Sequence, residues 1–163
     1  MDTGELREML DAVKVAQHAP REDNAAHQKT WSNMHALAEA RFLPALDFFV
    51  SCLDDDRWEW RINALRCIGF HYRFPADGAI AEKIRRMLLT DVGGFGQVRM
   101  AAASVLGGRS TWPDLALETA LKTDPDEDVR RVAFAALLTI GGIPYKVVRA
   151  EVQKTKVGES QPT

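Results

Sequence analysis

Three segments of this 163-residue chain repeat one residue pattern, and this repetition constrains the fold more than any other feature. The segments are Trp60–Gly69 (WRINALRCIG), Val98–Gly107 (VRMAAASVLG) and Val129–Leu138 (VRRVAFAALL). In each, a bulky apolar residue precedes an arginine, alanine follows that arginine by three positions, and apolar residues end the motif. The arginines are Arg61, Arg99 and Arg130, which are 38 and 31 positions apart. Such spacing is within the range of repeats built from pairs of helices.

An apolar segment precedes each copy, and acidic residues lie between the two. The apolar segments are 45–53, 80–89 and 115–121. The acids between them are Asp54–Asp56, Asp91, and Asp124 with Asp126, Glu127 and Asp128. An acid at a helix N-terminus accepts hydrogen bonds from free backbone N–H groups and faces the positive end of the helix dipole. The pattern therefore predicts antiparallel helix pairs with acidic turns.

This arrangement resembles the HEAT-repeat family, in particular its short subtype first noted in phycobilisome-lyase-like proteins. That subtype reads, loosely, Leu-Leu, an Asp-rich turn, then Val-Arg-x-x-Ala-x-x-Ala-Leu-Gly. The residues that carry the resemblance are Val98, Arg99, Ala102, Leu106, Gly107, Asp128, Val129, Arg130, Ala133, Ala136 and Leu137. The first copy departs by placing Trp60 where valine is usual, and the third lacks glycine after Leu137. The match covers residues 44 to 143.

The resemblance implies an all-α fold, an α-solenoid of about four antiparallel helix pairs that forms one domain over residues 1–153. Residues 1–43 are expected to form an N-terminal capping helix pair, 44–143 three repeats, and 144–153 a C-terminal cap. We expect a flexible polar tail at 154–163. The resemblance also implies that each recurring arginine pairs with an acid of its own or the adjacent turn, which is a structural role.

Apolar periodicity predicts three helices before the first copy of the motif. The first should end near Ala19–Pro20, because proline disfavours helical geometry in the residue before it. Asp23 or Asn24 is suited to cap the second helix, and Pro44 to begin the third. The expected inward residues are Leu6, Met9, Leu10 and Val13, then Trp31, Met34, Leu37 and Ala38, then Leu46, Phe49, Val50 and Leu53.

Composition limits the partners and the compartment of the chain. A formal net charge of −2, from 21 basic and 23 acidic residues, gives no general attraction to nucleic acid or anionic membrane. No stretch approaches the roughly 20 apolar residues of a membrane span, and the N-terminus lacks the pattern of a signal peptide. Cys52 and Cys67 are expected to be reduced core thiols rather than a disulfide. Cytoplasmic is the default expectation.

No group of residues predicts a catalytic site, and we expect neither a cofactor nor a metal. The four histidines, at positions 18, 27, 35 and 71, lack metal-ligand spacing with one another or with a cysteine. The chain has no nucleophile elbow and no Gly-Lys-Ser/Thr phosphate loop. The glycine-rich segment 92–96 is read as an inter-helix turn that presents Phe95. The sequence therefore predicts a protein that is not an enzyme.

Three surfaces are candidates for binding a protein partner. The first is aromatic and lies around the segment 70–75, although Phe70 and Phe74 could instead fill a gap below a longer repeat. The second follows from solenoid geometry, in which second helices line the concave side, and includes Ile62, Met100, Ala103, Ser104 and Ala135. The third is the edge formed by the acidic turns, where capping does not explain every acid. The residues expected to contact the partner are Trp58, Tyr72, Arg73, Leu65, Arg66, Phe95, Asp55, Asp126, Glu127, Asp128, Arg131 and Phe134.

These features together predict a non-enzymatic protein–protein interaction module. HEAT-like family members mostly serve as scaffolds, adaptors or inhibitors. One hypothesis is an immunity or inhibitor protein that blocks a toxin or other enzyme with a basic surface. The alternatives are a nucleic-acid-binding or DNA-repair HEAT-like protein, to which Arg66, Arg73 and Arg131 would contribute, and a chromophore-lyase-like subunit. The charge balance and the lack of a suitable cysteine arrangement favour a protein partner over both.

Overall fold

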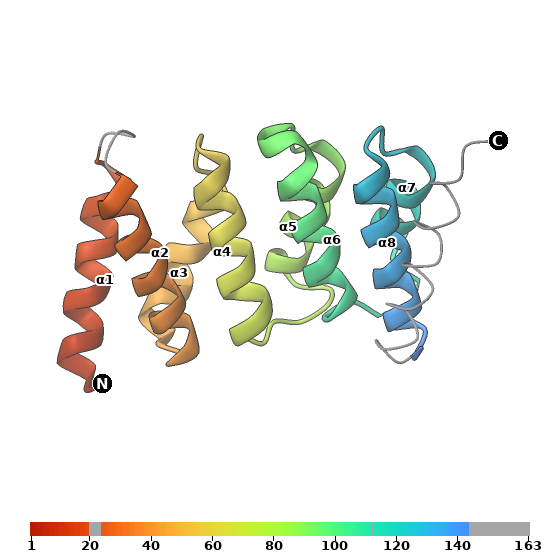
Figure 1. The fold of residues 1–163 in the computed structure, drawn as a ribbon. Coiled ribbons are helices and arrows are strands. Elements are labelled where there is room, and N and C mark those ends of the chain that lie inside the picture. The colour runs from red at the N-terminus through yellow and green to blue at the C-terminus, as the bar shows by residue number, and fades with distance from the viewer. Residues whose placement is uncertain (20–23, 112, 144–163) are drawn as a thin grey trace. The chain divides into compact units, whose positions relative to one another are not determined.

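The computed structural model describes residues 1–19, 24–111 and 113–143, and every regular element in these ranges is a helix (Figure 1). The expected all-α fold is confirmed for this part of the chain. The expected C-terminal cap and tail, 144–163, and the candidate cap Asp23 lie outside the described residues. The chain divides into two compact units, unit 1 (Met1–Arg73) and unit 2 (Phe74–Thr163), and each is described by itself.

Unit 1 contains four helices: α1 (Thr3–Gln17), α2 (Asn24–Glu39), α3 (Leu43–Cys52) and α4 (Trp58–His71). Helix α2 packs against the other three, and α3 also packs against α4. Asp2 and Glu5 form a reciprocal capping box at the start of α1, with bonds of 2.8 and 2.9 Å. The helix ends three residues before Pro20, as the sequence predicts, and Pro44 lies in the first turn of α3.

Aromatic rings fill the core of unit 1. Trp60 is buried, with edge-to-face contacts to Trp31 at 4.8 Å and to Phe48 at 6.4 Å between ring centroids. The predicted inward face of α3 is partly wrong, because Leu46 and Val50 are only half-buried. The face that is buried carries Ala45, Phe48, Phe49 and Cys52. Phe49 and Leu53 are buried as predicted, and the Phe48 ring is buried instead of Leu46 and Val50 because it removes more apolar surface from water.

Unit 2 contains α5 (Ala79–Thr90), the short 3-10 helix η1 (Gly93–Gly96), α6 (Gln97–Gly107), α7 (Leu115–Thr123) and α8 (Glu127–Ile140). Consecutive helices pack as the pairs α5/α6 and α7/α8. The first helices α5 and α7 also contact each other, as do the second helices α6 and α8. A Cβ built on Gly107 would lie 2.8 Å from Ala136 Cα, so α6 and α8 approach to within backbone contact. Small residues in the repeated motif allow this approach.

The recurring arginines tie each second helix to the turn before it. Arg61 donates to the carbonyl oxygen of Asp55 at 2.6 Å, Arg130 to that of Asp124 at 2.7 Å, and Arg99 to that of Asp91 at 2.7 Å. Arg99 Nε also donates to the Asp124 carboxylate at 2.8 Å, which links the α5/α6 pair to the α7/α8 turn. That ion pair matches the expectation from the resemblance, whereas the bonds common to all three arginines go to carbonyl oxygens.

Two further findings concern the cysteines and the membrane. Cys52 and Cys67 are free, fully buried thiols, as predicted. Burial raises the pKa of each thiol from 9.0 to about 12, so both are neutral at pH 7. Of the helices described, none has the length together with the apolar character needed to span a bilayer.

Candidate protein-binding surface

The turn between α5 and α6 presents two apolar side chains to solvent. Val92 is 91% exposed and Phe95 is 97% exposed. The backbone is left-handed at three successive residues, with φ of 63° at Gly94, 49° at Phe95 and 84° at Gly96. Glycine adopts this conformation freely, but in a residue with a Cβ it costs roughly 1–2 kcal/mol. Phe95 is therefore held in a strained conformation that displays its ring.

Hydrogen bonds and close packing hold this turn in place. Gly93 N–H donates to Asp91 Oδ1 at 2.7 Å, and Arg99 holds the Asp91 carbonyl oxygen. On the other side, the Asp126 carboxylate packs directly on Gly96, where a Cβ would overlap with Asp126 Oδ2. Asp126 also caps α8 by accepting from Asp128 N–H at 2.8 Å. The turn that carries Phe95 thus packs against the turn that begins α8.

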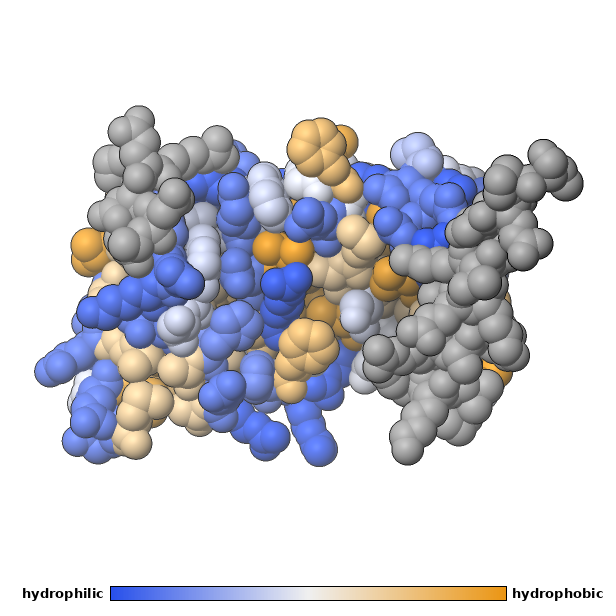
Figure 2. Space-filling view, in the orientation of Figure 1, coloured by the Kyte–Doolittle hydropathy of each residue, from blue (hydrophilic) through white to orange (hydrophobic). Residues whose placement is uncertain are grey.

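Acidic residues are frequent at the two turns, of which one carries Phe95. Five acids (Asp91, Asp124, Asp126, Glu127 and Asp128) occur there with three arginines (Arg99, Arg130 and Arg131). Glu127 and Asp128 project into solvent, and both accept hydrogen bonds from Arg131. We call Val92, Phe95, Asp126, Glu127 and Asp128 the acidic aromatic surface. Figure 2 shows hydrophobic side chains projecting where α5 and α6 meet, next to hydrophilic ones.

A groove of about 630 Å³ between α6 and α8 adjoins this surface. Asp128 and Arg131 belong to its lining, together with small or unbranched side chains such as Ser104, Ala135 and Met100. Gly107 and Ala136 form its floor where the two helices approach. The groove has the size of a site for a few side chains of a partner, and its lining holds one acid and one base.

The structure brings together five of the six sequence-predicted contact residues of unit 2. Phe95, Asp126, Glu127, Asp128 and Arg131 lie at the two turns and the mouth of the groove. Of the positions expected on the concave side, Met100, Ser104 and Ala135 line the groove, whereas Ala103 is buried. Phe134 is exposed on α8, but it is not among the residues that line the groove.

For three residues of unit 1, the prediction that they contact a partner at the surface is wrong. Tyr72 is only 4% exposed, and its hydroxyl donates to the Phe42 carbonyl oxygen at 2.9 Å. The reason is that α4 ends at His71 and the backbone becomes extended at Tyr72, so its ring packs on Phe49. Leu65 is fully buried in the α4 core face. Asp55 is largely buried in an ion pair with Arg57 at 3.0 Å and also accepts from Gln17.

The other residues of unit 1 remain at the surface to different degrees. Trp58 is half-buried, and Arg66 and Arg73 are exposed. Phe70 is 63% exposed, so it does not fill a gap below the repeat as one reading of the sequence proposed. Phe74, which begins unit 2, is half-buried and lies 6.0 Å below the Arg109 guanidinium. The segment 70–75 therefore does not form one continuous aromatic surface.

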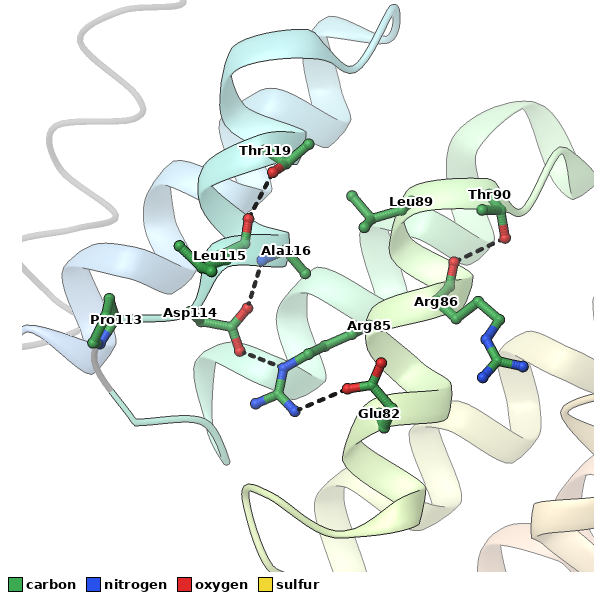
Figure 3. A pocket seen from close by; sticks show the side chains of 10 residues that line it. All are labelled: Glu82, Arg85, Arg86, Leu89, Thr90, Pro113, Asp114, Leu115, Ala116 and Thr119. Carbon is green, nitrogen blue, oxygen red and sulfur yellow. Dashed lines mark hydrogen bonds and ion pairs between the residues drawn. The ribbon is translucent and has the colours of Figure 1, made fainter.

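Sequence reasoning missed the ion pair that joins α5 to α7. Figure 3 shows Arg85 reaching from α5 to Asp114 at the start of α7, where Arg85 Nε lies 3.0 Å from Asp114 Oδ2. Asp114 also accepts from Ser110 at 2.6 Å and from two backbone N–H groups of α7. Burial raises its pKa, but the hydrogen bonds outweigh burial and hold the pKa below 3.8. The aspartate just before an apolar helix was a capping signal that could have identified this residue.

This ion pair lies beside a second groove, of about 550 Å³, between α5 and α7. Leu89 and Leu115 contribute exposed apolar atoms to it. Since Asp114 is saturated with donors from the chain itself, we assign this carboxylate to holding the helix pairs together. Within ranges 1–19, 24–111 and 113–143, no three His, Cys, Asp or Glu side chains gather as metal ligands would.

Neither protein-family models nor curated proteins nor solved structures yield a match to this chain.

Proposed function

We propose that this chain is a non-enzymatic protein-binding module built as a HEAT-like α-solenoid, and that unit 2 binds a partner protein with a basic surface. The stacking of like helices in unit 2 supports the architecture, because α5 contacts α7 and α6 contacts α8. The close approach at Gly107 and the arginine bonds to each turn support it too, since both arise from residues of the repeated motif.

The exposed ring of Phe95 carries the functional part of the proposal. A turn at this position forms most easily with glycine, and an apolar ring gains most by being buried. Phe95 is unfavourable in both respects. It is not glycine although its backbone is left-handed, and its apolar ring is 97% exposed. Aromatic side chains of this kind are frequent anchors of protein interfaces. A partner that buries the ring would recover the hydrophobic free energy that folding alone leaves unused.

Charge around Phe95 indicates the kind of partner. The acids outnumber the arginines at the two turns, and Glu127 and Asp128 project into solvent. A basic surface would be attracted to them, and its association rate would be higher at low salt than at high salt. This chemistry fits an immunity or inhibitor protein that covers a cationic active face of a toxin or another enzyme. It fits an adaptor for a basic protein equally well.

Two observations favour this proposal over the alternatives. Arg131, which a nucleic-acid-binding groove would need, is bonded to Glu127 and Asp128. Cys67, which a chromophore-lyase reaction would need, is fully buried with its pKa raised to about 12, so it is a poor nucleophile.

The test is affinity capture from the native host, followed by calorimetry with the recovered protein. The wild-type chain should capture one basic protein. Phe95→Ser should weaken its binding by about 30-fold, corresponding to the roughly 2 kcal/mol of an interface anchor. Glu127→Lys should also weaken the binding, and the loss of affinity should be larger at low salt than at high salt. Leu115→Ser is the matched control, because Leu115 is an exposed apolar residue of unit 2 outside the acidic aromatic surface. Equal binding by wild type and Phe95→Ser would contradict the proposal.

A further inference from the structure

After Glu59 in the first turn of α4, the chain continues through the rest of the helix and beyond it with basic residues and no acid. Between Glu59 and Asp77 there is no aspartate or glutamate, whereas Arg61, Arg66 and Arg73 all occur there. The whole chain has a net charge of −2, so this stretch is a local reversal of its charge. Arg61 is used inside unit 1, because it holds the carbonyl oxygens of Asp55 and Asp56. Arg66 and Arg73 are not used in this way.

The outward side of α4 combines Arg66 with an aromatic ring, and Arg73 comes three positions after that ring in the chain. Asn63, Arg66 and Phe70 follow one another at spacings of three and four, which places them on one side of the helix. Arg73 is the second residue after the end of the helix at His71. Among the described Phe, Tyr and Trp side chains of unit 1, Phe70 alone is exposed. We call Arg66, Phe70 and Arg73 the α4 face.

The arginines of the α4 face have no partner within the described chain. Arg57 is paired with Asp55, and Arg85, Arg99 and Arg131 are paired with acids of unit 2. Arg66 and Arg73 are exposed and form neither a hydrogen bond nor an ion pair with any other residue described. Their two positive charges are therefore available to a molecule that docks over Phe70.

We infer that the α4 face is a second docking surface, and that it binds an acidic segment of a protein that also presents an aliphatic or aromatic side chain. Carboxylates of the segment would pair with Arg66 and Arg73, which offer planar guanidinium groups suited to carboxylate. Its apolar side chain would cover Phe70, removing both from water. This surface is basic and lies in unit 1, so it is independent of the acidic aromatic surface and of the partner proposed for it.

A nucleic acid is a poorer fit to the same residues. Two arginines neutralise about two phosphates, and a single-stranded site of that size has a salt slope of only about −1.4. One exposed ring offers a stacking surface for one base, whereas single-strand binders use several along a cationic groove. An acidic peptide needs only one apolar contact and two ion pairs. The α4 face offers one ring for the contact and two arginines for the ion pairs.

The test is selection from a phage-displayed library of random 16-residue peptides. Peptides that bind the full-length chain are retained after removal of those that also bind the Arg66→Glu, Arg73→Glu double variant. The surviving sequences should be rich in Asp and Glu around a Phe, Trp, Leu or Ile. Synthesised with a fluorescent label, they should lose at least tenfold in affinity with the double variant and about tenfold with Phe70→Ala. Raising NaCl from 50 to 300 mM should weaken them several-fold.

Matched controls separate binding from stability. Arg7→Glu and Leu43→Ala change an exposed arginine and an exposed leucine of unit 1 that lie outside the α4 face, and they should leave affinity within twofold. Arg66→Gln, which leaves the helix with a good helix former, replaces the double variant if that one does not fold. Failure to recover peptides, peptides without acids, or peptides indifferent to Phe70 would overturn the inference. Two further results would also overturn it, if the same variants abolish them. One is binding of a 16-nucleotide oligothymidylate more tightly than the peptides, and the other is self-association of the chain.

Discussion

At position 96 a single glycine meets two structural demands at once. Its φ is 84°, and the Asp126 carboxylate occupies the space where a Cβ would be. The first demand concerns only the backbone, since a side chain raises the free energy of left-handed geometry. The second concerns the contact that joins the α5–α6 turn to the start of α8. Gly96 therefore determines where Phe95 lies relative to the acids.

Gly96→Ala should lower the free energy of unfolding by more than Gly142→Ala. Gly142 has almost the same φ, 82°, but nothing lies within 4 Å of its Cβ position. Gly142→Ala should thus report the backbone cost alone, about 1 kcal/mol, and Gly96→Ala that cost plus about 1–2 kcal/mol from displacing Asp126. Urea unfolding followed by circular dichroism measures both. Equal losses in the two variants would show that the contact with Asp126 carries no free energy.

At the scale of elements, the contact between α6 and α8 positions the groove. These helices meet where Gly107 faces Ala136, and the groove opens beside this meeting point. Ala102 and Ala133 occupy equivalent positions of the motif and are fully buried. Small side chains at the crossing bring the helix axes close together, so that larger residues such as Val98 and Leu106 fill the layers on either side.

Gly107→Ala should destabilise the chain by about 1–3 kcal/mol, because the new methyl group would lie 2.8 Å from Ala136. Gly108→Ala is the matched control. Its Cβ would lie 3.7 Å from the Val105 carbonyl oxygen, which is an ordinary contact, so we expect a change within about 0.5 kcal/mol. Adding Ala136→Gly to Gly107→Ala should recover part of the lost stability. A Gly107→Ala variant as stable as wild type would mean that α6 and α8 separate without loss.

At the scale of the whole molecule, each unit depends on one aspartate whose pKa is below its ordinary value. In unit 1 burial raises the pKa of Asp55, but hydrogen bonds from Arg57 and Gln17 outweigh burial and lower it below 3.8. In unit 2 the hydrogen bonds from Ser110, Leu117 N–H and Arg85 lower the pKa of Asp114 in the same way. Both carboxylates therefore favour the folded state while they are ionised.

The free energy of unfolding should fall as pH drops below about 4. A carboxyl group with a lowered folded-state pKa contributes its stability above its unfolded pKa, 3.8, and loses it as pH falls through the folded value. Asp55→Asn and Asp114→Asn should each be less stable at pH 7 and show a shallower loss between pH 4 and 2. Asp77→Asn controls for removing an exposed carboxylate. Thermal unfolding at several pH values measures this, and parallel curves for all four proteins would contradict it.

Local patterns in the sequence determined the helices and most of their ends. Apolar spacing, Pro44, the acids before α8 and the arginine-containing motif act over fewer than about ten residues, so they can be read without knowledge of the fold. The buried thiols and the turn at 92–96 were predicted on this basis, and the structure confirms them.

Only the tertiary structure decided which of these residues reach the surface and which of them meet. Tyr72 is buried where its hydroxyl donates to a carbonyl group 30 positions earlier in the chain. Asp55 is largely buried where it accepts a hydrogen bond from Gln17, 38 positions earlier. Gly96, next to Phe95 in the chain, meets Asp126 only because α6 packs on α8. Contacts between residues this far apart depend on how the helices stack, and the spacing of residues within one helix carries no information about that.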